Sequence, residues 1–218
     1  MSVPELANRA AAAPDPGPWA QALIHGRRST SPRRLCAPGP DAAQQQLILA
    51  AAGAAPDHGR ILPWRLIEVP LDQRARLGAA FAEALLERDP QATAEQVAQA
   101  AEKAQHAPWL LLALLRLGAE AAGPAGVEIP EHERLLATGA ALQNMLLQAS
   151  ALGLGSCLTS GQALQSGPLR RLFGLAADER ALCFVNIGHV AQPRALQQRP
   201  AVADYFGRLA PAPDAESP

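Results

Sequence analysis

The sequence has little of what marks a secreted, metal-binding or membrane protein. Its three cysteines, Cys36, Cys157 and Cys183, are widely spaced and form no CxxC pair, so neither a disulfide framework nor a zinc site is expected. The longest apolar run covers residues 107–115, far short of the roughly 20 residues that span a bilayer. No segment resembles a signal peptide. These absences predict a cytoplasmic protein that does not enter a membrane.

Charge is also scarce, and lysine almost absent. The formal net charge is −1 and only 18% of the residues are charged, which argues against a nucleic-acid binder. Lys103 is the one lysine, so arginine supplies nearly all of the positive charge. With 49% hydrophobic residues among 218, the composition is that of one globular domain. Ala- and Pro-rich ends predict flexible extensions at residues 1–18 and 207–218, around a domain at 19–206.

Hydrophobic spacing and capping residues predict a mixed set of helices and strands. Helices are expected from Trp19 to Gly26, from an Asp41 cap toward Gly53, from an Asp72 cap to Pro90, and from a Thr93–Gln96 capping box to Gln105. Strands are expected at Trp64–Val69 and Ala181–Val190, where apolar residues alternate or dominate. The leucine run from Trp109 to Gly118 fits helix by propensity, but its short length between Pro108 and Gly118 favours a buried strand. The sum is an α+β fold with a mostly antiparallel sheet between helices.

The longest predicted helix runs from Glu131 to Leu152 and is apolar on most of its faces. A helix of that kind must be covered on most sides, and one sheet covers only one side. A second copy of the chain is the economical cover, and burial within the monomer is the alternative. Gly153 is expected at the C′ position of this helix, and Gly155 in a tight turn that admits a flat ligand. Neither glycine belongs to a dinucleotide-binding fingerprint, which needs a preceding strand and a following helix.

Positive charge concentrates in Arg27-Arg28-Ser29, directly after the glycine that ends a helix. Two guanidinium forks, a hydroxyl and nearby backbone N–H groups suit a phosphate. A solvated basic loop is the alternative, because arginine is this chain's usual cation.

No side chain stands in a pattern typical of a catalytic nucleophile or a metal ligand. His58 is a candidate base, ligand contact or loop cap, and no histidine or carboxylate lies at metal-ligand spacing from it. His132 has glutamates on both sides, but adjacent helical residues point apart. The serines lack a GxSxG elbow. We therefore expect neither a metal nor a catalytic side chain.

Four segments, in this order and spacing, resemble the nitroreductase superfamily of FMN proteins, especially its small NAD(P)H nitroreductase branch. They are LIHGRRSTSPRRL (residues 23–35), LILAAAGAAPDHGRILPWRLIEV (47–69), ATGAALQNMLLQASALGLGSCLTSG (137–161) and VNIGHV (185–190). The resemblance covers about residues 19–199. It implies a nitroreductase-like fold, assembled as an intertwined homodimer around the helix that carries Gln143 and Asn144.

The resemblance also implies which residues bind the cofactor. Arg27, Arg28 and Ser29 would hold the FMN phosphate and ribityl chain, with Arg194 as the C-terminal phosphate contact and Arg199 as the competing position. Pro56 and His58 would lie near the flavin, often the partner's. The ring edge would pass four residues of the third segment: Leu158, Thr159, Ser160 and Gly161. Leu158-Thr159 replaces the Trp-Arg that many members carry.

The implied activity is hydride transfer from NAD(P)H through FMN to an electron-poor small molecule, a nitroaromatic, a quinone or similar, by a ping-pong mechanism. The flavin carries this chemistry, which agrees with the missing nucleophile. The alternative is a flavin-binding protein with a storage or regulatory role and little turnover. The sequence does not distinguish NADH from NADPH.

Overall fold

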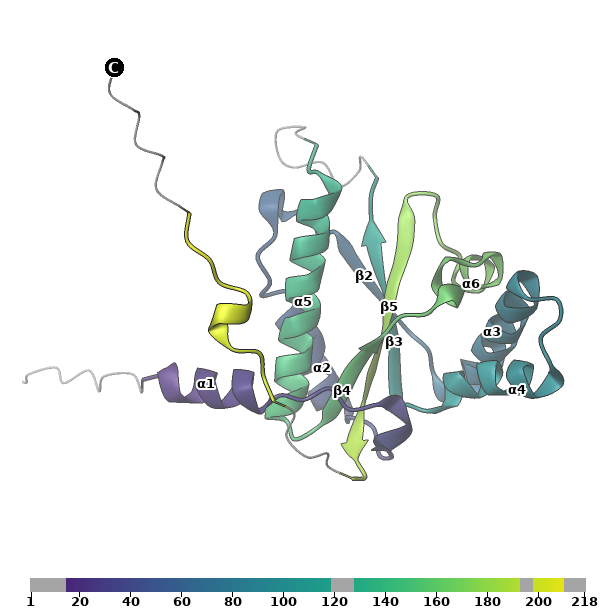
Figure 1. Ribbon diagram of the computed structural model, residues 1–218, viewed down its shortest axis with the longest axis horizontal. Helices are drawn as coiled ribbons and strands as arrows, with labels where there is room; N and C mark the ends of the chain where they lie inside the picture. The colour runs from purple at the N-terminus through teal and green to yellow at the C-terminus, as the bar shows by residue number, and fades with distance from the viewer. Residues whose placement is uncertain (1–14, 119–127, 193–197, 210–218) are drawn as a thin grey trace, which may run out of the picture.

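A five-stranded antiparallel sheet between two layers of helices forms the body of the protein (Figure 1). The computed structural model describes residues 15–118, 128–192 and 198–209. Its α-helices are α1 Gly17–Gly26, α2 Ala42–Ala52, α3 Arg74–Arg88, α4 Ala94–Glu102, α5 Glu131–Ala151 and α6 Gly167–Phe173. Its strands are β1 Leu35–Cys36, β2 Trp64–Glu68, β3 Trp109–Arg116, β4 Gly155–Thr159 and β5 Glu179–Val190. Short 3₁₀ turns are η1 Pro32–Arg34, η2 His58–Arg60, η3 Leu71–Gln73, η4 Lys103–Gln105, η6 Gln162–Gln165 and η7 Val202–Asp204.

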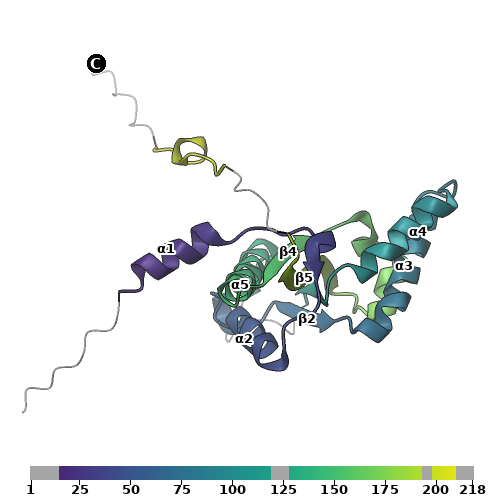
Figure 2. The ribbon, with the colours of Figure 1, turned by 90° about the horizontal axis from the view of Figure 1, so that it is seen from below.

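The long strand β5 organises the sheet, because β1, β3 and β4 all pair with it and β2 pairs with β3. Helices α2 and α5 cover one face, and α3 and α6 cover the other with α4 packed on α3 (Figures 1 and 2). This confirms the predicted α+β fold, with its antiparallel sheet between helices.

Strand β3 explains the leucine run that local propensity left ambiguous. Its alternate residues enter two separate cores, so both faces of the strand are apolar. Trp109, Leu111 and Ala113 pack toward α2 and α5. The intervening leucines pack toward α3 and α6. The prediction of a buried strand is confirmed, and a strand buried on both faces has no polar alternation to reveal it.

Helix α5 matches its predicted range and ends as expected, with Gly153 at φ +75°. Gly155 was wrongly placed in a turn. It lies inside β4, where a Cβ would come within 2.5 Å of Val190 and 2.9 Å of Leu35. Close packing of the neighbouring side chains therefore requires a small residue at this position.

The apolar faces of α5 are covered mostly from within the chain. Leu142, Met145 and Leu146 are buried in the core shared with α2 and the sheet. Among the leucines of this helix, Leu136 is the one whose exposed fraction exceeds one half, at 72%. The alternative of burial within the monomer therefore accounts for most of this helix.

The helix predicted to start at an Asp72 cap begins differently. Asp72 lies in η3, and α3 starts at Arg74 without any side-chain cap. Arg74 is buried, and its guanidinium donates at 2.8 Å to the Val69 carbonyl and at 2.8 Å to the Ala104 carbonyl. A tertiary anchor, rather than a local cap, fixes where this helix begins. The predicted caps at Asp41 and Thr93 are confirmed as capping boxes.

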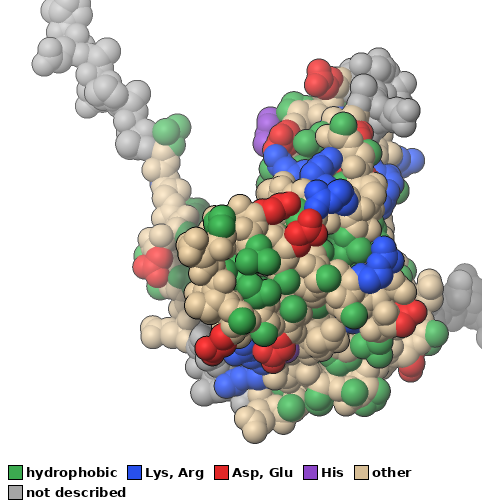
Figure 3. Space-filling view, turned by 90° about the vertical axis from the view of Figure 1, so that its right-hand side faces the viewer, with side chains coloured by type: hydrophobic (Ala, Val, Ile, Leu, Met, Phe, Trp, Pro, Cys, Tyr) green, Lys and Arg blue, Asp and Glu red, His purple; other side chains and the backbone are tan. Residues whose placement is uncertain are grey.

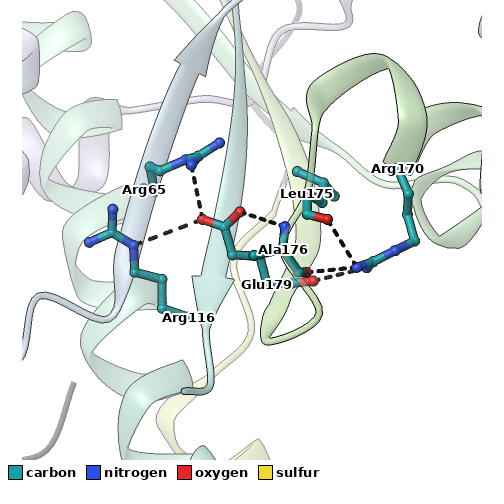
Figure 4. Close-up of polar contacts among 6 residues, drawn as sticks. All are labelled: Arg65, Arg116, Arg170, Leu175, Ala176 and Glu179. Atoms are coloured by element: carbon teal, nitrogen blue, oxygen red, sulfur yellow. Dashed lines mark hydrogen bonds and ion pairs between the residues drawn. The ribbon is translucent and has the colours of Figure 1, made fainter. Parts of the chain in front are cut away.

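One end of the sheet is held by the buried carboxylate of Glu179 (Figure 4). Its Oε1 lies 3.2 Å from Nη1 of Arg65 and 3.9 Å from Nε of Arg116, which come from β2 and β3. Its Oε2 accepts from the Ala176 N–H at 3.2 Å. Arg170 donates to three carbonyls of the same turn, those of Leu175, Ala176 and Glu179. The network joins three strands to α6, so it fixes the side of the sheet opposite to α5.

Two segments extend from the body and are largely apolar on their surfaces. No residue of α1 is buried, and residues 198–209 are exposed throughout (Figure 2). The large apolar side chains left exposed in these segments are Trp19, Ile24, Val202, Tyr205, Phe206 and Leu209. Surfaces of this kind are typical of contact with another chain.

No helix in the described ranges has the length and apolarity needed to cross a membrane.

Candidate functional site

The Arg27–Ser29 segment is fastened along the edge of the sheet. Helix α1 ends at Gly26, and the Arg27 N–H donates to the Leu23 carbonyl. Two residues on, the chain pairs with the start of β4: Ser29 and Ser156 form an isolated bridge, and the Thr30 N–H donates to the Ser156 carbonyl at 2.9 Å. The predicted phosphate residues thus occupy a fixed backbone position.

Three guanidinium groups meet at this position. Nη2 of Arg199 donates to the Arg27 carbonyl at 2.7 Å, which brings the C-terminal segment to the end of α1. Burial lowers the pKa of Arg27, and the charges of Arg199 and Arg28 lower it further. Nε of Arg28 is buried and has no hydrogen-bond partner among the described residues.

This arrangement fits a phosphate. No carboxylate of the described chain forms an ion pair with these arginines, so mutually repelling cations are held together with spare donors. Nη1 of Arg27 also lies 3.4 Å from the Ser29 hydroxyl, which adds a further polar group to the set. Bidentate guanidinium donors and a hydroxyl are the chemistry that phosphate oxygens accept from.

A cavity of about 830 Å³ opens beside this segment. Ser31 lines it, two residues beyond Ser29, so Ser29 and the cavity wall are within about 7 Å along the chain. The opposite wall comes from α3, α4 and η4, and the floor from Leu110 and Phe184 of the sheet.

The end of β4 forms one side of the cavity. Thr159, Ser160 and Gly161 line it, whereas Leu158, which is 41% exposed, does not. Asn186, buried on β5, donates to the Thr159 hydroxyl oxygen at 3.0 Å and so holds this strand end. Three of the four residues predicted at the ring edge therefore line the cavity that opens beside the Arg27–Ser29 segment.

The loop with Pro56 and His58 lies elsewhere and is strained. Nδ1 of His58 is 2.5 Å from Oε2 of Glu133, in the first turn of α5. Arg60 and Leu62 have positive φ angles of 53° and 48°, which non-glycine residues rarely adopt. Strain of this kind gathers at functional sites, where surrounding structure maintains it.

Within one chain, His58 is remote from the arginine cluster. It contacts the first turn of α5, whereas the cluster lies by β4, just beyond the last turn (Figure 1). From Glu133 to Ala151 the helix axis spans about 27 Å at 1.5 Å per residue. The predicted site residues therefore fall into two groups at opposite ends of one helix.

Sequence reasoning left some residues of this region aside. Ser31, Arg33 and Asn186 lay inside quoted segments but received no role, and Arg88 and Lys103 of the cavity wall carried no signal. Arg199 was named only as a competitor. Arg194, the predicted phosphate contact, lies outside the described residues.

In the described ranges no three His, Cys, Asp or Glu residues come together as a metal site would require. A family model described as the nitroreductase family matches residues 24–189. The chain belongs to the nitroreductase family.

Relatives and solved structures agree with membership in this family. A Haemophilus influenzae protein assigned as an NAD(P)H nitroreductase is 29% identical over 166 residues, covering 76% of this chain and 85% of its own length. An Escherichia coli protein assigned likewise is 28% identical over 166 residues, with the same coverage of 76% and 85%. A nitroreductase-like protein of Bacillus cereus has a TM-score of 0.73 at 21% identity, covering 87% of this chain and 95% of that one. The nitroreductase match contains the Arg27–Ser29 segment, the His58 loop and the end of β4, but not Arg199.

Proposed function

We propose that the protein is an FMN-dependent oxidoreductase that passes hydride from NAD(P)H to an electron-poor small molecule by a ping-pong reaction. The observation that carries this proposal is the trio of guanidinium groups with spare donors beside a cavity large enough for a ring system. Family membership and NAD(P)H nitroreductase relatives support it. So does a structural neighbour, an NADPH:FMN oxidoreductase of Vibrio harveyi complexed with NAD⁺, with a TM-score of 0.65 at 20% identity and coverage of 89% of this chain and 79% of that one.

The residues present would each take a share in holding the cofactor. Arg27, Arg28 and Arg199 would bind the phosphate, and Ser29 the phosphate or ribityl hydroxyls. The strand end at Thr159–Gly161 would lie along the ring edge, with its backbone donors and hydroxyls facing ring heteroatoms. Bound FMN supplies the redox chemistry, accepting and donating hydride, and no side chain needs to act as a nucleophile.

We propose further that the complete site takes residues from two copies of the chain. Helix α1 leads directly into Arg27, and the segment of residues 198–209 contains Arg199, so the exposed apolar residues of both adjoin the arginine cluster along the chain. A second copy would cover them there. Pro56 and His58, remote from the cluster in their own chain, would then reach the partner's flavin. The strained, Glu133-bound loop would present His58 in one orientation.

The first test is the colour of the purified protein. We expect a yellow holoprotein whose released chromophore has the mass of FMN, and NAD(P)H oxidation that depends on an added quinone or nitroaromatic. Bound FMN without such oxidation would favour a storage or regulatory role. A colourless protein that FMN does not stabilise would refute flavin binding.

A double variant, Arg27→Ala with Arg28→Ala, tests the phosphate assignment. Charge-assisted hydrogen bonds contribute about 1.5–3 kcal/mol each, so losing two predicts an FMN affinity about a hundredfold to ten-thousandfold lower. Arg76→Ala removes a positive charge from α3, away from the cluster and outside any ion pair of the described residues, and serves as the control. A folded double variant with full flavin content would contradict the assignment.

Mixed dimers test whether the site is shared. Co-expressing the Arg27→Ala, Arg28→Ala chain with a His58→Ala chain, each with its own tag, allows the mixed dimer to be isolated. If sites are shared, one of its two sites is intact and activity returns to about half of wild type. If each site lies within one chain, His58 is about 27 Å from the cluster along α5 and takes no part in the site. The His58→Ala parent then keeps wild-type activity, and that result would refute sharing.

A further inference from the structure

The cavity beside the arginine cluster has basic residues in its lining and no acidic ones. Among its lining residues are Arg33, Arg88, Lys103 and His106, and no aspartate or glutamate is among them. These four come from η1, the end of α3, η4 and the loop before β3. In a chain with a net charge of −1, a cavity whose ionisable lining residues are all basic is a local departure from the average composition.

Three of these basic residues carry charges that no acidic side chain neutralises. The side chains of Arg33, Arg88 and Lys103 make no ion pair or hydrogen bond within residues 15–118, 128–192 and 198–209. The nearby acidic residues of α3, Glu83 and Glu87, pair with Arg171 on α6. The lining therefore offers charges that a ligand can use.

His106 is the exception, because Nε2 lies 3.5 Å from Oε1 of Glu102. That carboxylate belongs to an adjoining hollow shared with Arg33 and His106, and it does not line the main cavity. The charge facing the cavity stays positive.

The interior of the same cavity is apolar and aromatic. Phe81 and Phe184 meet edge to face, with ring centroids 5.6 Å apart, and Leu85 and Leu110 complete the apolar lining. Flat rings pack well against such a surface. Around the helices that form this side, Lys and Arg side chains gather in separate groups rather than in one continuous patch (Figure 3). This pattern suits a small anion and not a polyanion.

We propose that the electron acceptor is a flat aromatic compound bearing an anionic substituent, a carboxylate or sulfonate, which Arg88 and Lys103 bind at the cavity mouth. The proposal rests on the proposed function, since it names the acceptor class of the same site. The anion also has a second possible source, the phosphates of the nicotinamide coenzyme. The phenyl rings of Phe81 and Phe184 line the same cavity as Arg88 and Lys103. This favours an anionic substituent attached directly to the acceptor's aromatic ring.

The test compares two acceptors of nearly equal size, 4-nitrobenzoate and 4-nitrobenzamide, with the holoenzyme. The quantity measured is the ratio of their kcat/KM values, which cancels effects on flavin loading. Exposed charge pairs contribute modestly, so we expect Arg88→Gln and Lys103→Gln each to lower the benzoate-to-benzamide ratio about three- to fivefold. Added salt should lower the ratio for wild type as well. Arg76→Gln, on α3 but outside the cavity lining, is the matched control.

Lys103 also supplies a readout without turnover, because it is the chain's one lysine. Reductive methylation with ¹³C-formaldehyde labels it and the terminal amine, and preserves its charge. Lys103→Arg identifies its NMR signal. We expect 4-nitrobenzoate to shift this signal saturably with a Kd at least threefold below that of 4-nitrobenzamide, and Arg88→Gln to reduce the difference about three- to fivefold.

The outcomes separate the two proposals. Without flavin, or with flavin and no reduction of either compound, the proposed function fails, and the methyl signal still decides whether the cavity prefers the anion. With an active holoenzyme, an acceptor ratio that neither variant alters overturns the inference. The inference is also overturned if the variants change only the ratio of the rates at which NADPH and NADH reduce the flavin anaerobically. That result would show that Arg88 and Lys103 bind the coenzyme.

Discussion

Replacing Arg199 with glutamine tests which of two C-terminal arginines, Arg199 or Arg194, binds the FMN phosphate. Arg199 donates at 2.7 Å to the Arg27 carbonyl, which places its charge at the cluster. Its charge also contributes to the lowered pKa of Arg27, after burial. Arg194 is the alternative and lies outside the described residues. Arg199→Gln and Arg194→Gln are therefore a matched pair, alike in the charge they remove.

The size of the effect follows from the exposure of Arg199. A charge-assisted hydrogen bond contributes about 1.5–3 kcal/mol, and because Arg199 is exposed we take the lower end. This predicts an FMN Kd about tenfold higher in Arg199→Gln. Without flavin, the loss of one hydrogen bond is offset by less repulsion of Arg27. The free energy of unfolding of the apoprotein should then change by less than about 1 kcal/mol.

The assay is quenching of FMN fluorescence on titration with apoprotein, at low salt and at 0.5 M NaCl. Wild type should lose more affinity with salt than Arg199→Gln, because it has one more cation at the phosphate. A tenfold loss in Arg194→Gln with none in Arg199→Gln would refute the reasoning. Equal affinity of both variants and wild type would show that neither arginine binds the phosphate.

Two further predictions concern stability and reactivity. Glu179→Gln leaves its two flanking arginines without a carboxylate, and should lower the free energy of unfolding by about 2–4 kcal/mol in urea denaturation, whereas an unchanged midpoint would contradict the network in Figure 4. Burial raises the pKa of the Cys157 and Cys183 thiols to about 11, so a thiol reagent at pH 8 should modify exposed Cys36 alone in the folded protein. Unfolded thiols lose their protons near pH 9 and these two only near 11, so stability should fall as pH rises, by about 1 kcal/mol per thiol between pH 8 and 10. A double Cys157→Ala, Cys183→Ala variant should show a flatter pH dependence, and an equal slope would count against the assignment.

Local signals predicted those parts of the fold that local interactions determine. The caps at Asp41 and Thr93 rest on side chains three residues apart, and both form as predicted. Asp72 has the same kind of side chain but lies in a 3₁₀ turn, because buried Arg74, bound to the nearby Val69 carbonyl and the distant Ala104 carbonyl, sets the start of α3. The predicted start of this helix was wrong because a tertiary contact, and not a local cap, determines it.

The candidate site shows the same division. Arg27–Ser29 was recognisable from its charge and its place after a helix-ending glycine. Nothing in the sequence brings Arg88 and Lys103 to one cavity, because each alone resembles an ordinary solvated position on a helix. Their convergence depends on how α3 and α4 pack, which no local pattern records.

The split of the site gives the strongest reason for a second copy of the chain. The apolar character of α5 suggested a partner, yet its own chain covers most of that helix. The better reason lies at its two ends: the strained loop of His58 at one, and the arginine cluster at the other, about 27 Å apart along the axis. Two copies arranged antiparallel along α5 would bring His58 of each chain toward the cluster of the other. The same arrangement would cover the exposed apolar residues of α1, so one packing would account for two independent features.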